Sequence, residues 1–200
     1  MNIELRADGC HITGYVNVTG KKSRPTITPH GKVVEIIEER AFERAIERAG
    51  NINVTVDHNK THIYASTEEG TVTLYEDSIG LHADVLITDT YLIDLAQKGK
   101  IRGWSFGMYN VQDELLTEER ADGYPIRMIK ALDLDHLTLV VNKQPVYSAT
   151  SIELRAEEVI DVEERAMDQT ITVVDNVVKK KEKIDYSKYE NRIISLKTAK

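Results

Sequence analysis

The segment that most constrains how this chain can fold is the glycine-rich run from Gly99 to Tyr109. Gly99 can end a helix, and the alternation after it predicts a short strand. In that strand Ser105 shares a face with Gly103 and Gly107, whereas larger side chains occupy the other face. Glycine weakens a strand, so two glycines beside a hydroxyl indicate that another backbone approaches closely. A nucleophile facing a bound peptide needs such a space, although the segment taken alone fits a purely structural strand better.

Composition narrows the class of protein. With 200 residues, 41% of them hydrophobic, the chain fits one domain with an appendage and can bury a sizeable core. The formal charge of −7 argues against a nucleic-acid binder, which would be basic, but not against peptide substrates. Cys10 is the only cysteine, so an intrachain disulfide and a cysteine-based zinc site are excluded. Without a signal segment or an apolar run of about 18 residues, we expect a soluble cytoplasmic protein that makes no membrane contact.

The remaining periodicity predicts a mainly β protein with a few helices. We expect strands over residues 12–18, 52–59, 71–76, 81–87, 101–109 and 132–141, with hairpin turns at 77–80 and 122–123. A loop is expected over 20–32, and helices over 34–49 and 90–98. From about residue 152 the sequence is strongly charged, so we expect a domain over 1–151 and a partly disordered or interacting extension over 152–200.

Two histidines lie on apolar strand faces. His58 ends one strand, where a core role is the commoner outcome but a general base is also well placed. His136 lies in the most apolar strand, where an unpaired polar group would cost a few kcal/mol. Alternation puts Asp135 on the opposite face, so we expect that Asp135 and His136 do not serve one site. His58 and His62 have zinc-like spacing, but the glutamate of the hydrolytic motif is absent, and we expect no metal site.

A short echo links the two ends of the predicted domain. Residues 3–8 read Ile-Glu-Leu-Arg-Ala-Asp and residues 152–157 read Ile-Glu-Leu-Arg-Ala-Glu. The match is too short for a repeat fold, and chance explains it most simply. In a protease, however, similar sequences at both domain edges could be cleavage sites.

Taken in order, several segments resemble the prohead (capsid maturation) serine proteases of tailed bacteriophages and, more distantly, the herpesvirus assemblins. The resemblance covers about three quarters of the chain and rests on residues 13–15, 35–42, 56–59, 77–81, 103–108, 137–140 and 145–147. It implies an α+β, mainly β fold, a small closed antiparallel barrel surrounded by a few helices. It also implies Ser105 as nucleophile, His58 as general base and His136 as the third member, with Asp135 as the fallback. Phage relatives usually have an acid as third member, whereas assemblins use a Ser-His-His arrangement.

The function implied by the resemblance is cleavage of scaffold and major capsid protein inside the assembling procapsid, in the host cytoplasm, together with self-cleavage. A homodimer is also implied, because assemblins require one, and no cofactor is expected. A non-enzymatic scaffold or capsid-interaction module on the same fold is the alternative. A small-molecule hydrolase is disfavoured, because Ser105 lacks the Gly-x-Ser-x-Gly elbow of that fold.

Overall fold

The computed structural model describes residues 1–142, 150–155, 158–166 and 169–177, which form two helices and thirteen strands in two sheets. The smaller sheet has five strands in the order β13-β1-β2-β8-β7. Their bounds are Thr172–Asp175, Asn2–Arg6, Gly9–Val18, Gly80–Ile87 and Val72–Glu76. All its neighbours are antiparallel except β13, which pairs in parallel with β1.

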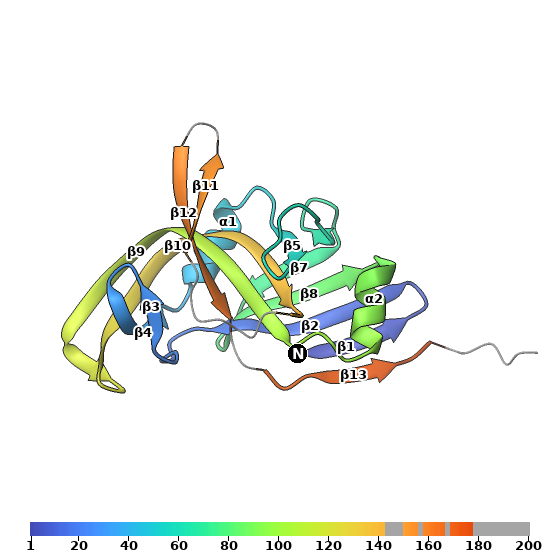
Figure 1. Cartoon of the computed structure of the whole chain (residues 1–200), viewed down its shortest axis with the longest axis horizontal. Helices are drawn as coiled ribbons and strands as arrows, with labels where there is room; N and C mark the ends of the chain where they lie inside the picture. Colours follow the sequence, from blue (N-terminus) through green and yellow to red (C-terminus); the bar gives the residue numbers. More distant parts are fainter. Residues whose placement is uncertain (143–149, 156–157, 167–168, 178–200) are drawn as a thin grey trace, which may run out of the picture.

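The larger sheet is built around one long bent hairpin, β9–β10, which crosses the molecule in Figure 1. Its strand order is β11-β12-β9-β10-β4-β3. Their bounds are Thr150–Arg155, Glu158–Ala166, Gly103–Ala121, Tyr124–Val140, Gly31–Ile37 and Thr26–Thr28. The far end of β10 pairs in parallel with β5 (Asn53–Val56), which also pairs with the two-residue strand β6 (Ala65–Ser66).

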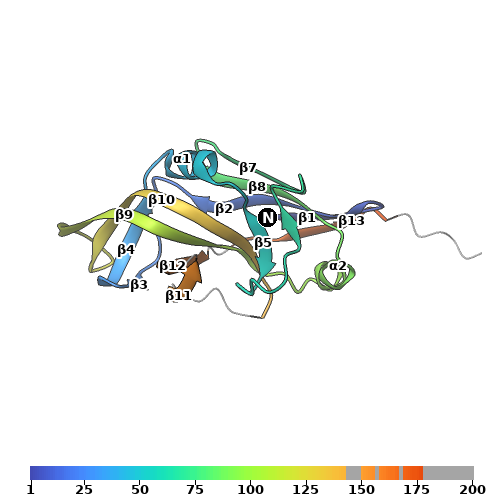
Figure 2. The same cartoon turned by 90° about the horizontal axis from the view of Figure 1, so that it is seen from above.

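Two short helices cover the sheets. α1 (Ala41–Arg48) packs Phe42 against Phe106 of β9, and α2 (Thr90–Gln97) begins at Asp89, whose carboxylate accepts a hydrogen bond from the Leu92 amide. Figure 2 shows α1 and the β11–β12 hairpin on opposite sides of the β9–β10 ribbon. Trp104, Phe106 and Met108 are fully buried in the main core, on the face of β9 away from Ser105. The predicted alternation of this strand is therefore confirmed.

The mainly β class, the 71–87 and 122–123 hairpins and the second helix are confirmed by the structure. The closed barrel is wrong: each described sheet is open, with β13 and β7 or β11 and β3 at its edges. The physical reason lies in the length of β9 and β10. Their outer halves extend beyond the smaller sheet, and there β10 pairs with β4 instead of curling to meet another edge (Figure 1).

Two predicted element bounds are also wrong. The helix expected from Val34 begins only at Ala41, because the β-branched run before it forms β4, parallel to β10. Within the loop expected over 20–32, three residues form β3, which pairs with β4. The valine and isoleucine residues of this run fit helical spacing by coincidence, and they belong to β4.

The segment after residue 152 supplies strands to both sheets. β12 pairs with β9, and β13 pairs with β1 at the opposite end of the sequence. Whether residues 152–200 are removed stays a prediction. Among the described residues no helix is long and apolar enough to cross a membrane.

Candidate active site

Ser105 lies in β9 with 2% of its surface exposed. Its Oγ is 2.8 Å from Nε2 of His58 and 2.6 Å from the backbone oxygen of Arg165 in β12. In the pairing of β9 with β12, Ala166 lies opposite Ser105 and Glu164 lies opposite Gly107. The close backbone approach expected from the flanking glycines is therefore made by β12.

Gly107 is required by a histidine ring as well as by this strand. A Cβ atom placed on Gly107 would lie 2.5 Å from Cε1 and 2.7 Å from Nδ1 of His136. Such contacts are far inside van der Waals distance, so any larger residue would displace the ring or the strand. Because Gly107 has no side chain, the His136 ring has room to pack directly against β9.

We expect Gly107→Ala to lower kcat at least about 100-fold, because small displacements of reacting groups are costly, and to lower the free energy of unfolding by about 1–3 kcal/mol. Peptide hydrolysis and urea unfolding measure the two effects. Gly50→Ala is the matched control, because nothing lies within 4 Å of its added methyl group. A fully active Gly107→Ala protein would contradict the placement of His136.

His58 lies just beyond the end of β5, in a turn rather than in the strand predicted for it. Asp57 and His58 both have left-handed backbones, with φ of 49° and 61°, and each such residue costs about 1–2 kcal/mol. Hydrogen bonds hold the turn: the His58 amide donates to Oγ1 of Thr138 at 3.0 Å, and Oδ1 of Asp57 accepts from the Val141 amide at 2.8 Å. This turn directs the imidazole toward Ser105.

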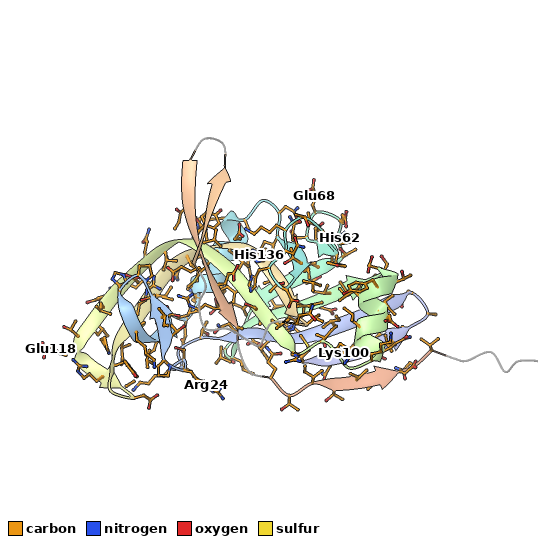
Figure 3. All side chains as sticks on the ribbon, in the orientation of Figure 1. Arg24, His62, Glu68, Lys100, Glu118 and His136 are labelled. Atoms are coloured by element: carbon orange, nitrogen blue, oxygen red, sulfur yellow. The ribbon has the colours of Figure 1, made fainter. Side chains whose placement is uncertain are left out.

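A chain of hydrogen bonds continues from His58 into the protein. Nδ1 of His58 is 2.8 Å from Nε2 of His136, and Nδ1 of His136 is 2.6 Å from Oδ2 of Asp135. Lys60 contacts the same carboxylate oxygen through its ammonium group. His136 and Asp135 are 2% and 8% exposed, and Figure 3 places His136 near the middle of the molecule, with His62 toward the periphery.

The carboxylate at the end of this chain fixes both histidine tautomers. A carboxylate only accepts, so Nδ1 of His136 must carry the proton that it shares with Asp135. Nε2 of a neutral His136 then accepts the proton on Nδ1 of His58. Nε2 of His58 is left as an acceptor 2.8 Å from Oγ of Ser105, where it competes for the one hydroxyl proton with the Arg165 oxygen, to which that hydroxyl donates at 2.6 Å. Each neutral histidine therefore carries its one proton on Nδ1, and the unprotonated Nε2 of His58 faces Ser105.

Asp135 and His136 belong to the same site, which corrects the expectation from strict alternation. The pairing of β10 with β9 shifts register between Leu134 and His136, so Asp135 is an extra residue in a bulge. A bulge redirects one side chain relative to the next. Asp135, the fallback third member, is therefore hydrogen-bonded to Nδ1 of His136, the nitrogen that does not face His58.

Next to this hydrogen-bonded chain, four buried charged residues join β12 to the rest of the molecule. Arg127 of β10 donates to Glu35 at 2.9 Å and to Glu163 at 2.6 and 2.8 Å, and Arg165 donates to both glutamates. Burial alone would raise the pKa of Glu163 and lower that of Arg127. The hydrogen bonds and opposite charges outweigh burial, so the pKa of Glu163 is lowered and those of Arg127 and Arg165 are raised.

The lowered pKa of Glu163 predicts a pH-dependent loss of stability. An unfolded glutamate titrates near about 4.3, so the stabilisation is complete above that pH and is lost as the pH falls through the folded pKa. We expect Glu163→Gln to lower the free energy of unfolding by about 1–3 kcal/mol at pH 7, with a smaller gap at pH about 3. Urea unfolding at both pH values tests this, with the exposed Glu118→Gln as control. A gap that widens in acid would contradict it.

Sequence reasoning missed the roles of Glu35, Arg127 and Arg165. Glu35 falls within the helix expected over 34–49, whereas it is a buried residue of β4 with 4% of its surface exposed. The signal that could have found it is the flanking pair of β-branched residues on each side, which favours a strand. A charged residue in such a strand requires a partner.

A serine hydroxyl, a histidine and a third group in hydrogen-bond reach form the arrangement of a serine hydrolase. The model of the caudovirus prohead serine protease family matches residues 1–165. This chain belongs to that family, and it is a phage capsid-maturation serine protease. No curated protein and no solved structure matches the chain.

Proposed function

We propose that this protein is a serine endopeptidase that cleaves scaffold and major capsid protein inside the assembling procapsid in the host cytoplasm, and that it also cleaves itself. Ser105 is the nucleophile, His58 the general base and His136 the orienting third member. The observation that carries the assignment is the unbroken chain of short contacts from Oγ of Ser105 to Asp135. Family membership supports proteolysis of capsid-related proteins.

The first step follows from the tautomers. Oγ of Ser105 attacks the peptide carbonyl carbon while Nε2 of His58 takes its proton, which leaves His58 as an imidazolium. That cation donates from Nδ1 to His136, whose imidazole is itself polarised by the carboxylate of Asp135. A carboxylate one ring away thus supplies the charge stabilisation that a histidine third member lacks.

The second step releases the amine and restores the enzyme. His58 returns the proton to the leaving nitrogen, and the peptide remains as an ester on Ser105. Water then attacks the ester with the same histidine as base. Asp135 stays ionised throughout, and Lys60 beside it balances its charge.

The test is co-expression of the wild-type chain with scaffold and major capsid protein, followed by mass spectrometry of new amino termini. We expect cleavage of both proteins with wild type and none with Ser105→Ala, while capsid assembly proceeds. Equal cleavage with both forms would refute the proposal. Co-assembly without proteolysis by either form would favour the non-enzymatic capsid-interaction module.

A further inference from the structure

The end of β12 lies across the nucleophile as an extended peptide. It pairs antiparallel with β9 from Glu163 to Ala166, which is how many proteins bind peptide strands. The hydroxyl of Ser105 donates a hydrogen bond of 2.6 Å to the carbonyl oxygen of Arg165, so that oxygen, rather than the carbonyl carbon, is the nearest atom of the peptide bond to Oγ. The peptide bond from Arg165 to Ala166 is therefore the one that lies next to the serine, and Oγ has to move from the carbonyl oxygen to the carbonyl carbon to attack it.

The Arg165 side chain is held by a fixed carboxylate of the protease body. Its Nε donates to one oxygen of Glu35 at 2.5 Å and its Nη2 to the other at 2.8 Å. Both side chains are buried, at 7% and 5% exposure. Two parallel hydrogen bonds to a carboxylate require the planar guanidinium fork, which lysine does not have.

The acidic residue two positions earlier has its own partner. Arg127 of β10 donates from Nη1 and Nη2 to the two carboxylate oxygens of Glu163, at 2.6 and 2.8 Å. Arg127 also donates to Glu35 at 2.9 Å, which fixes the two recognising side chains relative to each other. The surface that holds β12 thus contacts a glutamate, a second glutamate whose carboxylate lies 3.5 Å from Nδ1 of His58, an arginine and then an alanine opposite Ser105.

The pattern Glu-x-Arg-Ala recurs in this chain. It occurs at residues 4–7, 38–41, 118–121, 153–156 and 163–166. The copies at residues 4–7 and 153–156 lie within the two similar segments 3–8 and 152–157, so those segments and β12 share one pattern. Of the five, the described structure pairs the last one with the serine strand. β11, which holds part of the fourth copy, pairs with β12 instead.

We infer that this protease recognises extended peptides of the form Glu-x-Arg-Ala and cuts after the arginine, with Glu35 binding the arginine and Arg127 the glutamate. The inference rests on the proposed function. In β12, Oγ of Ser105 bonds to the carbonyl carbon of Arg165, the carbon–nitrogen bond to Ala166 breaks, and the amine leaves with the proton from His58. Water hydrolyses the ester, which yields the Arg165 carboxylate and free Ser105.

The test uses peptides with the sequence of residues 160–170, cut by the full chain and followed by mass spectrometry. Versions with citrulline or lysine in place of arginine, and with glutamine in place of the first glutamate of the pattern, are compared for kcat/KM. We expect cleavage after arginine, a loss of about 100-fold with citrulline, which keeps the shape but not the charge, and about 10-fold losses with lysine and glutamine. The chain's own β12 competes with all peptides equally, so the ratios are unaffected.

The protein variants sharpen this test. Glu35→Gln should reduce the preference for arginine over citrulline to about threefold or less, whereas Glu38→Gln, an exposed neighbour, should retain it. If Glu35→Gln does not fold, the peptide series on the wild-type chain still decides. Equal rates for arginine and citrulline peptides, with cleavage abolished by Ser105→Ala, would overturn the recognition proposal alone. Cleavage unaffected by Ser105→Ala would overturn the proposed function and this inference together.

Discussion

An alanine at position 105 is expected to lower kcat for peptide hydrolysis about 10⁶-fold and to leave the fold intact. His58→Ala should cost nearly as much, and the double variant should be no slower than either one. Nucleophile and base act as a unit, so removing either one removes the same step. Their contact of 2.8 Å between Oγ and Nε2 is the geometric basis for this expectation.

Initial rates on the peptide of residues 160–170 measure this prediction, with circular dichroism as the check on folding. Ser78→Ala and His62→Ala are the matched controls, because both side chains are exposed and lie outside the hydrogen-bonded chain. Additive losses in the double variant, or a loss smaller than about 100-fold in either single variant, would contradict the shared role.

Asparagine in place of Asp135 is expected to lower kcat about 10³-fold, with a much smaller change in KM. The amide can donate to Nδ1 of His136, which moves the proton of that ring to Nε2 and reverses the tautomer of His58. Nε2 of His58 then carries a proton and cannot accept one from Ser105. A wrong tautomer behind a correctly placed base is known to cost about 10⁴-fold in serine proteases.

The control for Asp135→Asn is Asp133→Asn, two residues earlier in the same strand. The Asp133 carboxylate bonds to Arg48 at 2.8 Å and to the amide of Asn110 at 2.9 Å, away from the histidines. Its replacement should leave kcat within about threefold of wild type. Equal effects of the two substitutions would mean that Asp135 acts only on the stability of β10.

Local patterns were enough to find the residues that face one another across the site. The alternation of 101–109 placed Ser105 opposite three bulky core residues, and the structure has this arrangement. His58 was found because it ends an apolar strand, although the backbone there is a left-handed turn rather than a strand. The turn depends on hydrogen bonds to Thr138 and Val141, about 80 residues away, which no local pattern encodes.

Other features depend on long-range pairing and could not be predicted locally. The bulge before His136 exists only in register with β9, so alternation wrongly separated Asp135 from the site. Glu35 is a strand residue because β4 pairs with β10, some 90 residues away. The position of β12 at Ser105 also depends on distant pairing. Its charged sequence forms a strand there because buried partners on other strands stabilise its charges.

The most direct measurement of the central claim is the site of covalent labelling by a fluorophosphonate. Trypsin releases residues 103–120 as one peptide, in which Ser105 is the only serine. We expect the wild-type chain to carry the label on that serine, and His58→Ala to be labelled at least about 100-fold more slowly, because the base activates the nucleophile. Labelling confined to another residue, or labelling of Ser105 at an equal rate without His58, would contradict the assignment of Ser105 as an activated nucleophile.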